Sequence, residues 1–299
     1  MRIQFTDDFD PGLIAESGQC FRWYALDEKS WRVLHGEHCL ILSKVGPQEY
    51  DLDCAEAEYD AVWRPYLDME ESYAAIRQRI DPAEDPFLYA AAQSQRGLRI
   101  LRQQPWEALA SFIISQNRNI PAIRRSIELL CQAAGTPCRD RRGEGYFAFP
   151  TPGAVAAMDD AALASCKLGY RDKYLRAAAE TVAAGRVDLA ALCRTEPEKS
   201  LEALLTLKGV GVKVAACVQL FGLHQLDAFP VDVWIRRVLE AEYPGGYPRD
   251  RYSPYNGVYQ QYMFAYYRGK SFYHQHGAFE ARGENGSIAS QEGTGSYDV

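Results

Sequence analysis

The chain has 299 residues, of which 47% are hydrophobic and 24% are charged, and its formal net charge is −7. These values are ordinary for a globular protein with one large domain or two smaller ones. No apolar run reaches the length of a membrane span, and the N-terminus turns acidic at once, so we expect a cytoplasmic protein without a membrane segment.

The first part of the chain predicts a small antiparallel sheet. Residues 21–26, 31–36 and 38–45 form short segments that are rich in β-branched and aromatic residues and are separated by turn residues. Residues 51–80 then have the spacing of a helix with one apolar face, and two prolines mark its exit.

From residue 97 onward the pattern is helical almost throughout. Helices are expected at 105–114, 120–130, 171–183, 199–205, 212–221, 232–239 and 254–267. A link rich in Gly, Pro and Arg, residues 135–145, separates the second from the third. The sequence therefore predicts an α+β fold, with a sheet domain over 1–95, a helical domain over 96–270 and a disordered tail over 271–299.

The charge is distributed unevenly over these parts. Residues 1–95 carry 8 Lys/Arg and 19 Asp/Glu, a balance of −11, whereas residues 96–270 carry 24 and 17, a balance of +7. Concentrated positive charge is what a surface that binds a polyanion needs. Chance clustering in a globular protein would give the same pattern.

The eight cysteines are scattered, with no CxxC pair and no histidine pair at metal-ligand spacing. This distribution argues against a disulfide framework and against a metal site. We expect most of the cysteines to be small buried apolar residues.

The most informative segment begins with a tight glycine turn, Gly209-Val210-Gly211, between two helical patterns. Glycine permits positive φ and close backbone approach. The amides that open the next helix can then face an anion, with the helix dipole behind them. The turn predicts a phosphate site that is independent of base sequence, and a plain tight turn is the alternative. It is not a nucleotide P-loop, because Val214 stands where Ser or Thr would follow the lysine.

Lys213 and Asp232 follow this turn. Lys213 lies in an otherwise apolar helical pattern, so we expect it to be a buried amine nucleophile. Asp232 precedes the next helical pattern and is expected to be its N-cap, a fixed carboxylate that can stabilise positive charge developing on a sugar. A surface lysine and a purely structural cap are the alternatives.

With these residues the chain resembles the helix-hairpin-helix DNA glycosylases and, among them, the 8-oxoguanine DNA glycosylase family. Four further segments carry the resemblance in the same order: SGQCFRW at 17–23, SFI through NRNI at 111–120, LGYR at 168–171, and PYNG through Gln260 and Phe264 at 254–264. The match runs from about residue 5 to residue 268. It implies an N-terminal antiparallel, TBP-like sheet domain followed by an all-helical HhH-GPD domain.

The resemblance also implies roles for matched residues. By role they are the nucleophile and Schiff-base residue Lys213 with its catalytic partner Asp232; the base pocket of Gly18, Phe21, Cys217, Gln260 and Phe264; the gap-filling, cytosine-contacting Asn117, Tyr170 and Arg171; and the phosphate hairpin of Gly209, Val210 and Gly211. Within the pocket, Gly18 would accept the N7 hydrogen of an everted 8-oxoguanine and Gln260 would read its Watson–Crick edge. Phe264 and Cys217 would sandwich the base, although a buried structural cysteine is an alternative for Cys217.

Three positions depart from the family pattern. Trp234 stands where eukaryotic relatives have a histidine, Arg118 where they have a second asparagine, and Ala122 where they have the arginine that reads the opposite cytosine. The last departure predicts weaker selection for cytosine opposite the lesion.

The implied activity is excision of 8-oxoguanine from duplex DNA through base flipping and a Schiff base, followed by β-elimination, as in base excision repair. No metal or organic cofactor is expected. The expected partner is double-stranded DNA containing 8-oxoguanine, bound by a monomer in the cytoplasm at the bacterial nucleoid. Two alternatives remain. A monofunctional glycosylase for alkylated bases would need neither Lys213 nor the Gly18 pocket, and a non-catalytic DNA-binding protein would lack Lys213 or Asp232.

Overall fold

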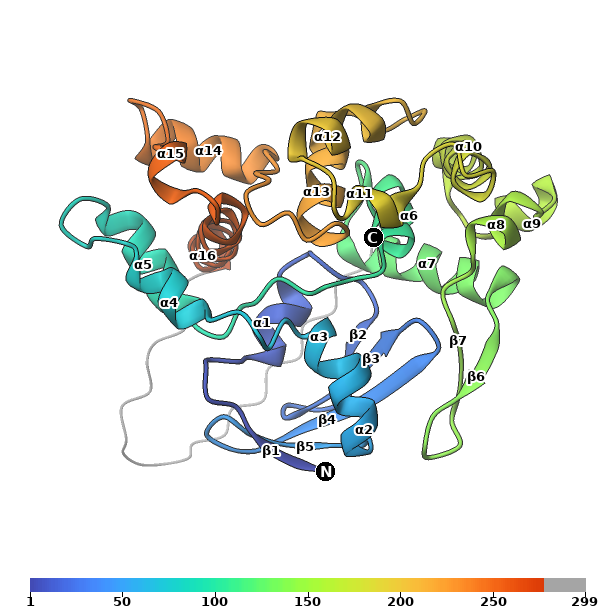
Figure 1. Ribbon diagram of the computed structural model, residues 1–299, viewed down its shortest axis with the longest axis horizontal. Helices are drawn as coiled ribbons and strands as arrows, with labels where there is room; N and C mark the ends of the chain where they lie inside the picture. The colour runs from blue at the N-terminus through green and yellow to red at the C-terminus, as the bar shows by residue number, and fades with distance from the viewer. Residues whose placement is uncertain (277–299) are drawn as a thin grey trace, which may run out of the picture.

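The structure is a computed structural model, and it describes residues 1–276. An antiparallel sheet forms one side of the molecule, and most of the helices form a layer above it (Figure 1). The strands of the sheet are β1 (Arg2–Gln4), β2 (Trp23–Ala25), β3 (Ser30–His35), β4 (His38–Gly46) and β5 (Glu49–Leu52), in the order β1-β5-β4-β3-β2.

The three predicted strands are confirmed, whereas β1 and β5 were not predicted. They have three and four residues, too few for a clear alternating pattern. Asp51 and Leu52 were expected to open a helix, and this prediction is wrong. They end β5, where Leu52 pairs with Leu42 of β4 and is buried.

The helices of the sheet-side half are short and interrupted. They are α1 (Pro11–Glu16), α2 (Glu56–Glu58), the π turn η1 (Tyr59–Trp63), α3 (Arg64–Tyr66), α4 (Tyr73–Gln78) and α5 (Pro86–Ser94). The prediction of a single helix over 51–80 is therefore wrong. The chain leaves the helical conformation at Asp68, whose φ is +53°. Ser72 then caps the next helix by accepting a hydrogen bond from the amide of Ala75.

Every helix predicted after residue 97 is confirmed. The helices of this half are α6 (Pro105–Ser115), α7 (Ile120–Ala134), α8 (Pro152–Ala156), α9 (Asp160–Ser165), the 3-10 turn η2 (Gly169–Arg171), α10 (Asp172–Ala183), α11 (Leu189–Leu192), α12 (Pro197–Leu205), α13 (Val212–Phe221), α14 (Val233–Glu242), α15 (Arg249–Tyr252) and α16 (Asn256–His276). Residues 271–276, expected to belong to the tail, continue α16. The rest of the expected tail, 277–299, lies outside the described residues.

The expected link over 135–145 contains a β-hairpin instead. Its strands are β6 (Pro137–Arg139) and β7 (Gly145–Phe147), and it runs from the helical layer down to the flank of the sheet (Figure 1). Arg32 of β3 lies 3.1 Å from the Asp140 carboxylate, and the Tyr146 hydroxyl donates to the carbonyl of Glu37. The hairpin therefore ties the helical layer to the sheet.

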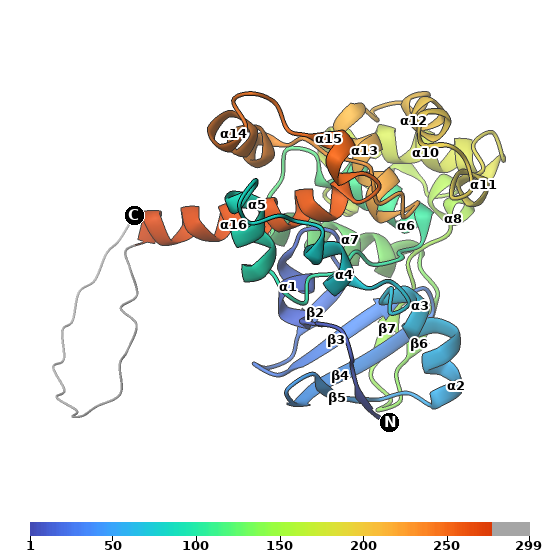
Figure 2. The same cartoon turned by 60° about the vertical axis from the view of Figure 1, so that its left-hand side comes forward.

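Helix α16 connects distant parts of the chain. Figure 2 shows it lengthwise, with α5 beside it and α14 on its other side, and it packs against both. One continuous apolar core includes side chains from the sheet and from the helical layer. The domain boundary expected at residues 95–96 stays a prediction.

Candidate active site

The glycine turn forms a hairpin between α12 and α13. Gly209 has φ +82°, and a Cβ atom there would lie 2.4 Å from Cγ of Tyr174. Only glycine meets both demands, because an L side chain would be strained and would overlap the ring. Gly211 is the N-cap of α13 and makes no side-chain cap, and a Cβ atom there would meet nothing within 4 Å. The first turn of α13 therefore has no side-chain cap and begins beside open space, as an anion site requires.

Lys213 lies in the first turn of α13 and is exposed, so the expectation that it is buried is wrong. The helix buries its apolar face from Val214 onward, whereas its first turn emerges from the core. The Lys213 Nζ atom lies 5.9 Å from the centroid of the Phe112 ring. The nucleophile candidate thus stands at the rim of the apolar core.

Asp232 is the N-cap of α14, as predicted. Its Oδ1 atom accepts hydrogen bonds from the amides of Trp234, at 3.0 Å, and Ile235, at 2.8 Å. Both bonds use the same oxygen, so Oδ2 takes no part in the cap. The cap fixes the carboxylate and leaves one oxygen to act elsewhere.

Cys217 connects Lys213 with Asp232. Its side chain is buried, and burial raises the pKa of the thiol to about 11. The Lys213 ammonium counters this rise through its charge and a hydrogen bond, whereas the Asp232 carboxylate adds to it. Since both charges act on one sulfur, the Lys213 amine and the Asp232 carboxylate both lie near the buried Cys217 thiol.

The segment from Gly18 to Phe21 approaches this group from the sheet side. Gly18 has φ +77°, and its α-carbon faces the Phe264 ring, 3.8 Å from the position a Cβ atom would take. Phe21 is buried and meets Phe112 edge to face, with ring centroids 5.9 Å apart. Phe112 is the ring beside Lys213.

Gln260 lies one helical turn before Phe264 on α16 and is buried. Its Nε2 atom donates to the carbonyl of Pro230 at 3.0 Å, and its Oε1 atom accepts from Gln261 at 3.0 Å. Pro230 comes two residues before Asp232. One N–H and one lone pair of the Gln260 amide are therefore engaged, and the second N–H and the second lone pair remain for another partner.

These links form a set of neighbouring residues that closes on itself, called here the ring. In order, the ring passes through Gly18, Phe264, Gln260, Pro230, Asp232, Cys217, Lys213, Phe112 and Phe21. The link between Asp232 and Cys217 is electrostatic, and those from Phe264 to Gln260, from Pro230 to Asp232 and from Phe21 to Gly18 run along the chain. The structure thus brings together all seven residues predicted for catalysis and the base pocket. Phe112 and Pro230 complete the ring and were not predicted, because each looks like an ordinary core or turn residue in the sequence.

The loop that carries Asp232 is held from behind by Asn256 and Gly257. The buried Asn256 donates through Nδ2 to Asp227 at 2.6 Å and to the carbonyl of Arg249 at 3.0 Å. A Cβ atom at Gly257 would lie 2.4 Å from the carbonyl oxygen of Ala228. The PYNG segment therefore fixes the loop that leads to Asp232.

The gap-filling candidates lie together beside the hairpin. Asn117 is exposed, has φ +52° and donates to the Tyr170 hydroxyl at 3.2 Å. Arg171, in contrast, is only 7% exposed, and its guanidinium binds backbone carbonyls of the loop. In this structure Arg171 does not project into open space as Asn117 and Tyr170 do.

Arg118 and Trp234, two of the departures from the family pattern, are also engaged. Arg118 donates to the Ser126 hydroxyl at 2.8 Å and to the carbonyl of Lys167 at 2.9 Å. Trp234 is half-buried and lies under Arg237, 5.1 Å from the guanidinium carbon to the ring centroid. Neither side chain points freely away from the protein.

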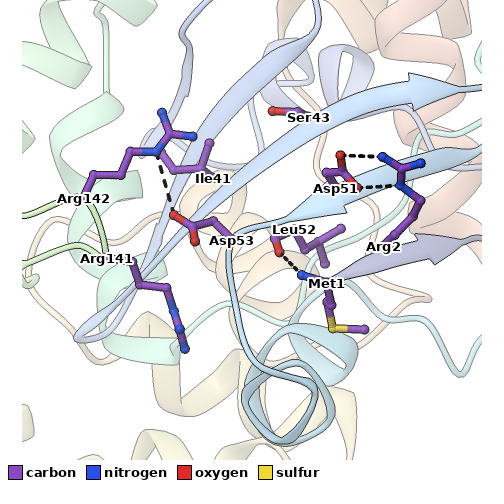
Figure 3. Close-up of a pocket in the computed structure, with 9 residues that line it drawn as sticks. All are labelled: Met1, Arg2, Ile41, Ser43, Asp51, Leu52, Asp53, Arg141 and Arg142. Atoms are coloured by element: carbon purple, nitrogen blue, oxygen red, sulfur yellow. Dashed lines mark hydrogen bonds and ion pairs between the residues drawn. The ribbon is translucent and has the colours of Figure 1, made fainter.

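A surface pocket of about 560 Å³ lies elsewhere, on the sheet beside the loop that joins β6 to β7 (Figure 3). Arg2 is bonded there to Asp51 at 2.8 Å, and Arg142 lies 3.8 Å from Asp53. The arginines of this pocket are thus paired with carboxylates, the Met1 ammonium donates to the Leu52 carbonyl, and no residue of the pocket belongs to the ring. Within residues 1–276, no group of three or more His, Cys, Asp or Glu side chains is placed to hold a metal ion. Over the same residues, no helix is both long and apolar enough to cross a bilayer.

The chain matches known DNA repair proteins over most of its length. The family model described as 8-oxoguanine DNA glycosylase, N-terminal domain, matches residues 2–109. The model described as HhH-GPD superfamily base excision DNA repair protein matches residues 110–244. The probable N-glycosylase/DNA lyase of Methanothermobacter thermautotrophicus is 30% identical over 84% of this chain and 88% of its own length.

Two solved structures are similar over nearly the whole fold. MBOgg1 in complex with a low affinity DNA ligand is 33% identical with a TM-score of 0.84, over 90% of this chain and 96% of its own. The 8-oxoguanine glycosylase/lyase of Clostridium acetobutylicum, in complex with dsDNA containing cytosine opposite to 8-oxoG, is 29% identical with a TM-score of 0.82, over 91% and 98%. The predicted fold class is confirmed, and the chain belongs to the 8-oxoguanine DNA glycosylase family of the HhH-GPD superfamily.

Proposed function

We propose that this chain excises 8-oxoguanine from duplex DNA and then cleaves the resulting abasic strand by β-elimination. The observation that carries the proposal is the ring, in which an amine, a carboxylate and the residues expected to form the base pocket are neighbours. Relatives named N-glycosylase/DNA lyase support the same reaction. The presence of both Lys213 and Gly18 in the ring argues against a monofunctional glycosylase for alkylated bases, because such an enzyme would need neither.

The chemistry assigns separate roles to Lys213 and Asp232. After the Lys213 ammonium loses a proton to solvent, its free amine attacks C1′, the C1′–N9 bond breaks, and the electron pair of that bond leaves with the base. Asp232 stabilises the positive charge on the sugar as the base departs. Loss of a proton from the attacking nitrogen and opening of the sugar then give an imine. That imine makes a C2′ proton acidic, and its removal expels the 3′ phosphate.

The pocket roles are those that the resemblance implies, and the proximity of these residues in the ring supports them. The Gly18 carbonyl is proposed to accept the N7 hydrogen that 8-oxoguanine has and guanine lacks. Phe264 and Cys217 are proposed to cover the two faces of the base, and Gln260 to read its edge. Phe21 supports this pocket indirectly, because it is buried behind Phe112.

DNA is proposed to bind across the exposed starts of α13 and α14. The hairpin of Gly209, Val210 and Gly211 would hold a phosphate, and Asn117 and Tyr170 would enter the gap left by the everted base. Because Lys213 is exposed in the free protein, the duplex itself would cover the nucleophile. We expect a monomer that acts at the nucleoid in the cytoplasm and needs no cofactor.

Borohydride trapping tests this proposal. With an 8-oxoguanine duplex, the wild-type chain should form a covalent protein–DNA adduct, and Lys213→Gln should form none. Lys208→Gln is the matched control, since Lys208 is also exposed and lies beside the same hairpin. Release of base without trapping would identify a monofunctional glycosylase. Binding without release would identify a non-catalytic protein, and either result would overturn the proposal.

A further inference from the structure

The short helix α1 ends against two arginines from the helical layer, which are called here the clamp. In both views α1 lies between the sheet and that layer (Figures 1 and 2). Arg124 of α7 donates through Nη2 to the carbonyl of Ala15 at 3.1 Å. Arg268 of α16 donates through Nη1 to the carbonyl of Glu16 at 3.2 Å. The last carbonyls of a helix have no partner inside it and favour a nearby cation, so the clamp stabilises this end of α1.

Packing holds Arg124 beside the segment that contains Gly18. Its side chain is half-buried, and its Nε atom is buried without a hydrogen-bond partner among the described residues. A solvated arginine would not leave this donor unmet. Burial raises the pKa of the Cys20 thiol, and the charge of Arg124 counters this rise. Arg124 therefore lies near the chain on both sides of Gly18.

Arg268 joins the clamp to the base pocket. It lies one helical turn after Phe264 on α16, and its guanidinium carbon is 5.9 Å from the centroid of the Phe264 ring. The same ring faces the α-carbon of Gly18. Helix α16 thus contacts the end of α1 through Arg268 and the next turn of the chain through Phe264.

Ser17 connects the end of α1 with the Gly18 carbonyl. The buried Ser17 hydroxyl donates to the Ile14 carbonyl at 2.7 Å and accepts from the amide of Gln19 at 3.4 Å. The peptide between Gly18 and Gln19 is trans, so its N–H and its C=O point in opposite directions. The bond from the Gln19 amide to Ser17 therefore sets the direction of the Gly18 carbonyl.

The far side of this peptide is fixed inside the protein. Gln19 donates through Nε2 to the Arg99 carbonyl at 2.8 Å and accepts at Oε1 from the amide of Leu101 at 2.8 Å. Gln103 donates to the Gln19 carbonyl at 2.7 Å. Among the described residues, none donates a hydrogen bond to the Gly18 carbonyl itself. This carbonyl is thus free to accept a bond, whereas the groups on either side of it are held.

We propose that Arg124 and Arg268 are positioning residues, which set the direction of the Gly18 carbonyl by holding the end of α1. The inference rests on the proposed function, in which that carbonyl accepts the N7 hydrogen of the everted base. The described bonds of the clamp go to α1 and not to Lys213 or Asp232. The clamp should therefore matter for release of 8-oxoguanine and not for β-elimination at an abasic site, where there is no base to recognise.

The test compares these two reactions in single turnover, with protein saturating the duplex. Arg124→Ala and Arg268→Ala should each slow release of 8-oxoguanine roughly tenfold, about the effect of one lost hydrogen bond, and change cleavage of a preformed abasic site by less than about twofold. Arg124→Lys keeps a cation near the Ala15 carbonyl and should recover part of the loss. Arg125→Ala is the matched control, because Arg125 is the next residue of α7 and is exposed, and it should leave both rates unchanged.

Amide hydrogen exchange in the free protein tests the positioning directly. Both alanine variants should speed exchange of the Gln19 amide, and Arg125→Ala should not. Unchanged release of 8-oxoguanine, an equal loss in both reactions, or unchanged exchange at Gln19 would overturn the inference. If Arg124→Ala does not fold, Arg124→Lys and Arg268→Ala carry the same comparison. If the wild type releases no 8-oxoguanine, the proposed function fails, and exchange at Gln19 still decides whether the clamp positions this peptide.

Discussion

The Gly209→Ala substitution should disturb the hairpin more than a methyl group added at any other residue of the hairpin. Residue 209 has φ +82°, which costs an L residue roughly 1–2 kcal/mol. The added Cβ atom would also lie 2.4 Å from Cγ of Tyr174 and 2.7 Å from Cδ1, so the ring has to move. Overpacking of this kind costs about 1–3 kcal/mol. The two effects together amount to about 2–5 kcal/mol.

Two assays show where this free energy is lost. Urea unfolding measures the loss in the free energy of unfolding. Duplex affinity at two salt concentrations measures the loss in binding free energy that a displaced hairpin causes. If the hairpin moves and the fold survives, a loss of about 2 kcal/mol corresponds to roughly 30-fold weaker DNA binding. We expect most of the damage in binding, because the hairpin lies at the edge of the core.

Gly211→Ala is the matched control. Position 211 has φ −94° and open space around its α-carbon, so alanine should cost less than about 1 kcal/mol of stability there. The double variant Gly209→Ala/Tyr174→Ala should regain the free energy lost to overlap with the Tyr174 ring. It should still lack the free energy lost to the positive φ at residue 209. If Gly209→Ala has the wild-type free energy of unfolding in urea and the wild-type affinity for DNA, the close approach of the hairpin to Tyr174 is refuted.

Three further predictions use other parts of the structure. Because Ala122 replaces the cytosine-reading arginine, the rate of base removal opposite C should exceed that opposite A by less than several hundredfold, and a larger preference would contradict this. Asn256→Ala should lower kcat with little change in KM and cost about 1–2 kcal/mol in urea unfolding, because Asp227 loses the bond that fixes the Asp232 loop; a change in KM alone would contradict the positioning role. Burial raises the pKa of Glu107 to about 7 from an ordinary value near 4.5, against the pull of Arg22. The folded state therefore holds the proton more tightly than the unfolded state does. The free energy of unfolding should fall by roughly 3 kcal/mol as pH rises from about 4.5 to about 7. Urea unfolding of Glu107→Gln should show no such dependence on pH.

The sequence predicted the helices well because their signal is local. The apolar spacing of α6, α7 and α13 and the cap at Asp232 can be read within a dozen residues. Strands β1 and β5 and the hairpin of β6 and β7 gave no such signal, since their stability comes from pairing with partners elsewhere. Pattern alone therefore predicts the longer helices after residue 97 and strands β2, β3 and β4. It misses β1, β5 and the β6–β7 hairpin, together with the short helices α8, α9, α11 and α15.

The site residues were predicted through the resemblance and not from local pattern, because some of them lie more than two hundred residues apart in the sequence. Their partners were not recovered. Gln116, Phe112 and Asn256 look like ordinary helix or loop residues until the fold places Gly209, Lys213 and Asp227 beside them. Arg171 shows the converse: its expected role came from position in a motif, whereas its bonds point inward to carbonyls.

The exposure of Lys213 changes how the site must be completed. The sequence suggested burial because neighbours at Val214 and beyond are apolar, but the first turn of α13 projects from the core, with Val212 67% exposed. Val233, next to Asp232 at the start of α14, is 58% exposed. Two large apolar side chains thus flank the amine and the carboxylate on the open side, where a docking surface would cover them. We expect the protein to supply the back and walls of the pocket, and the duplex to supply the cover that excludes water when the base is everted. Catalysis should then depend on DNA bound in register with the hairpin and with Asn117, so residues that hold those segments should affect the rate without touching the reacting atoms.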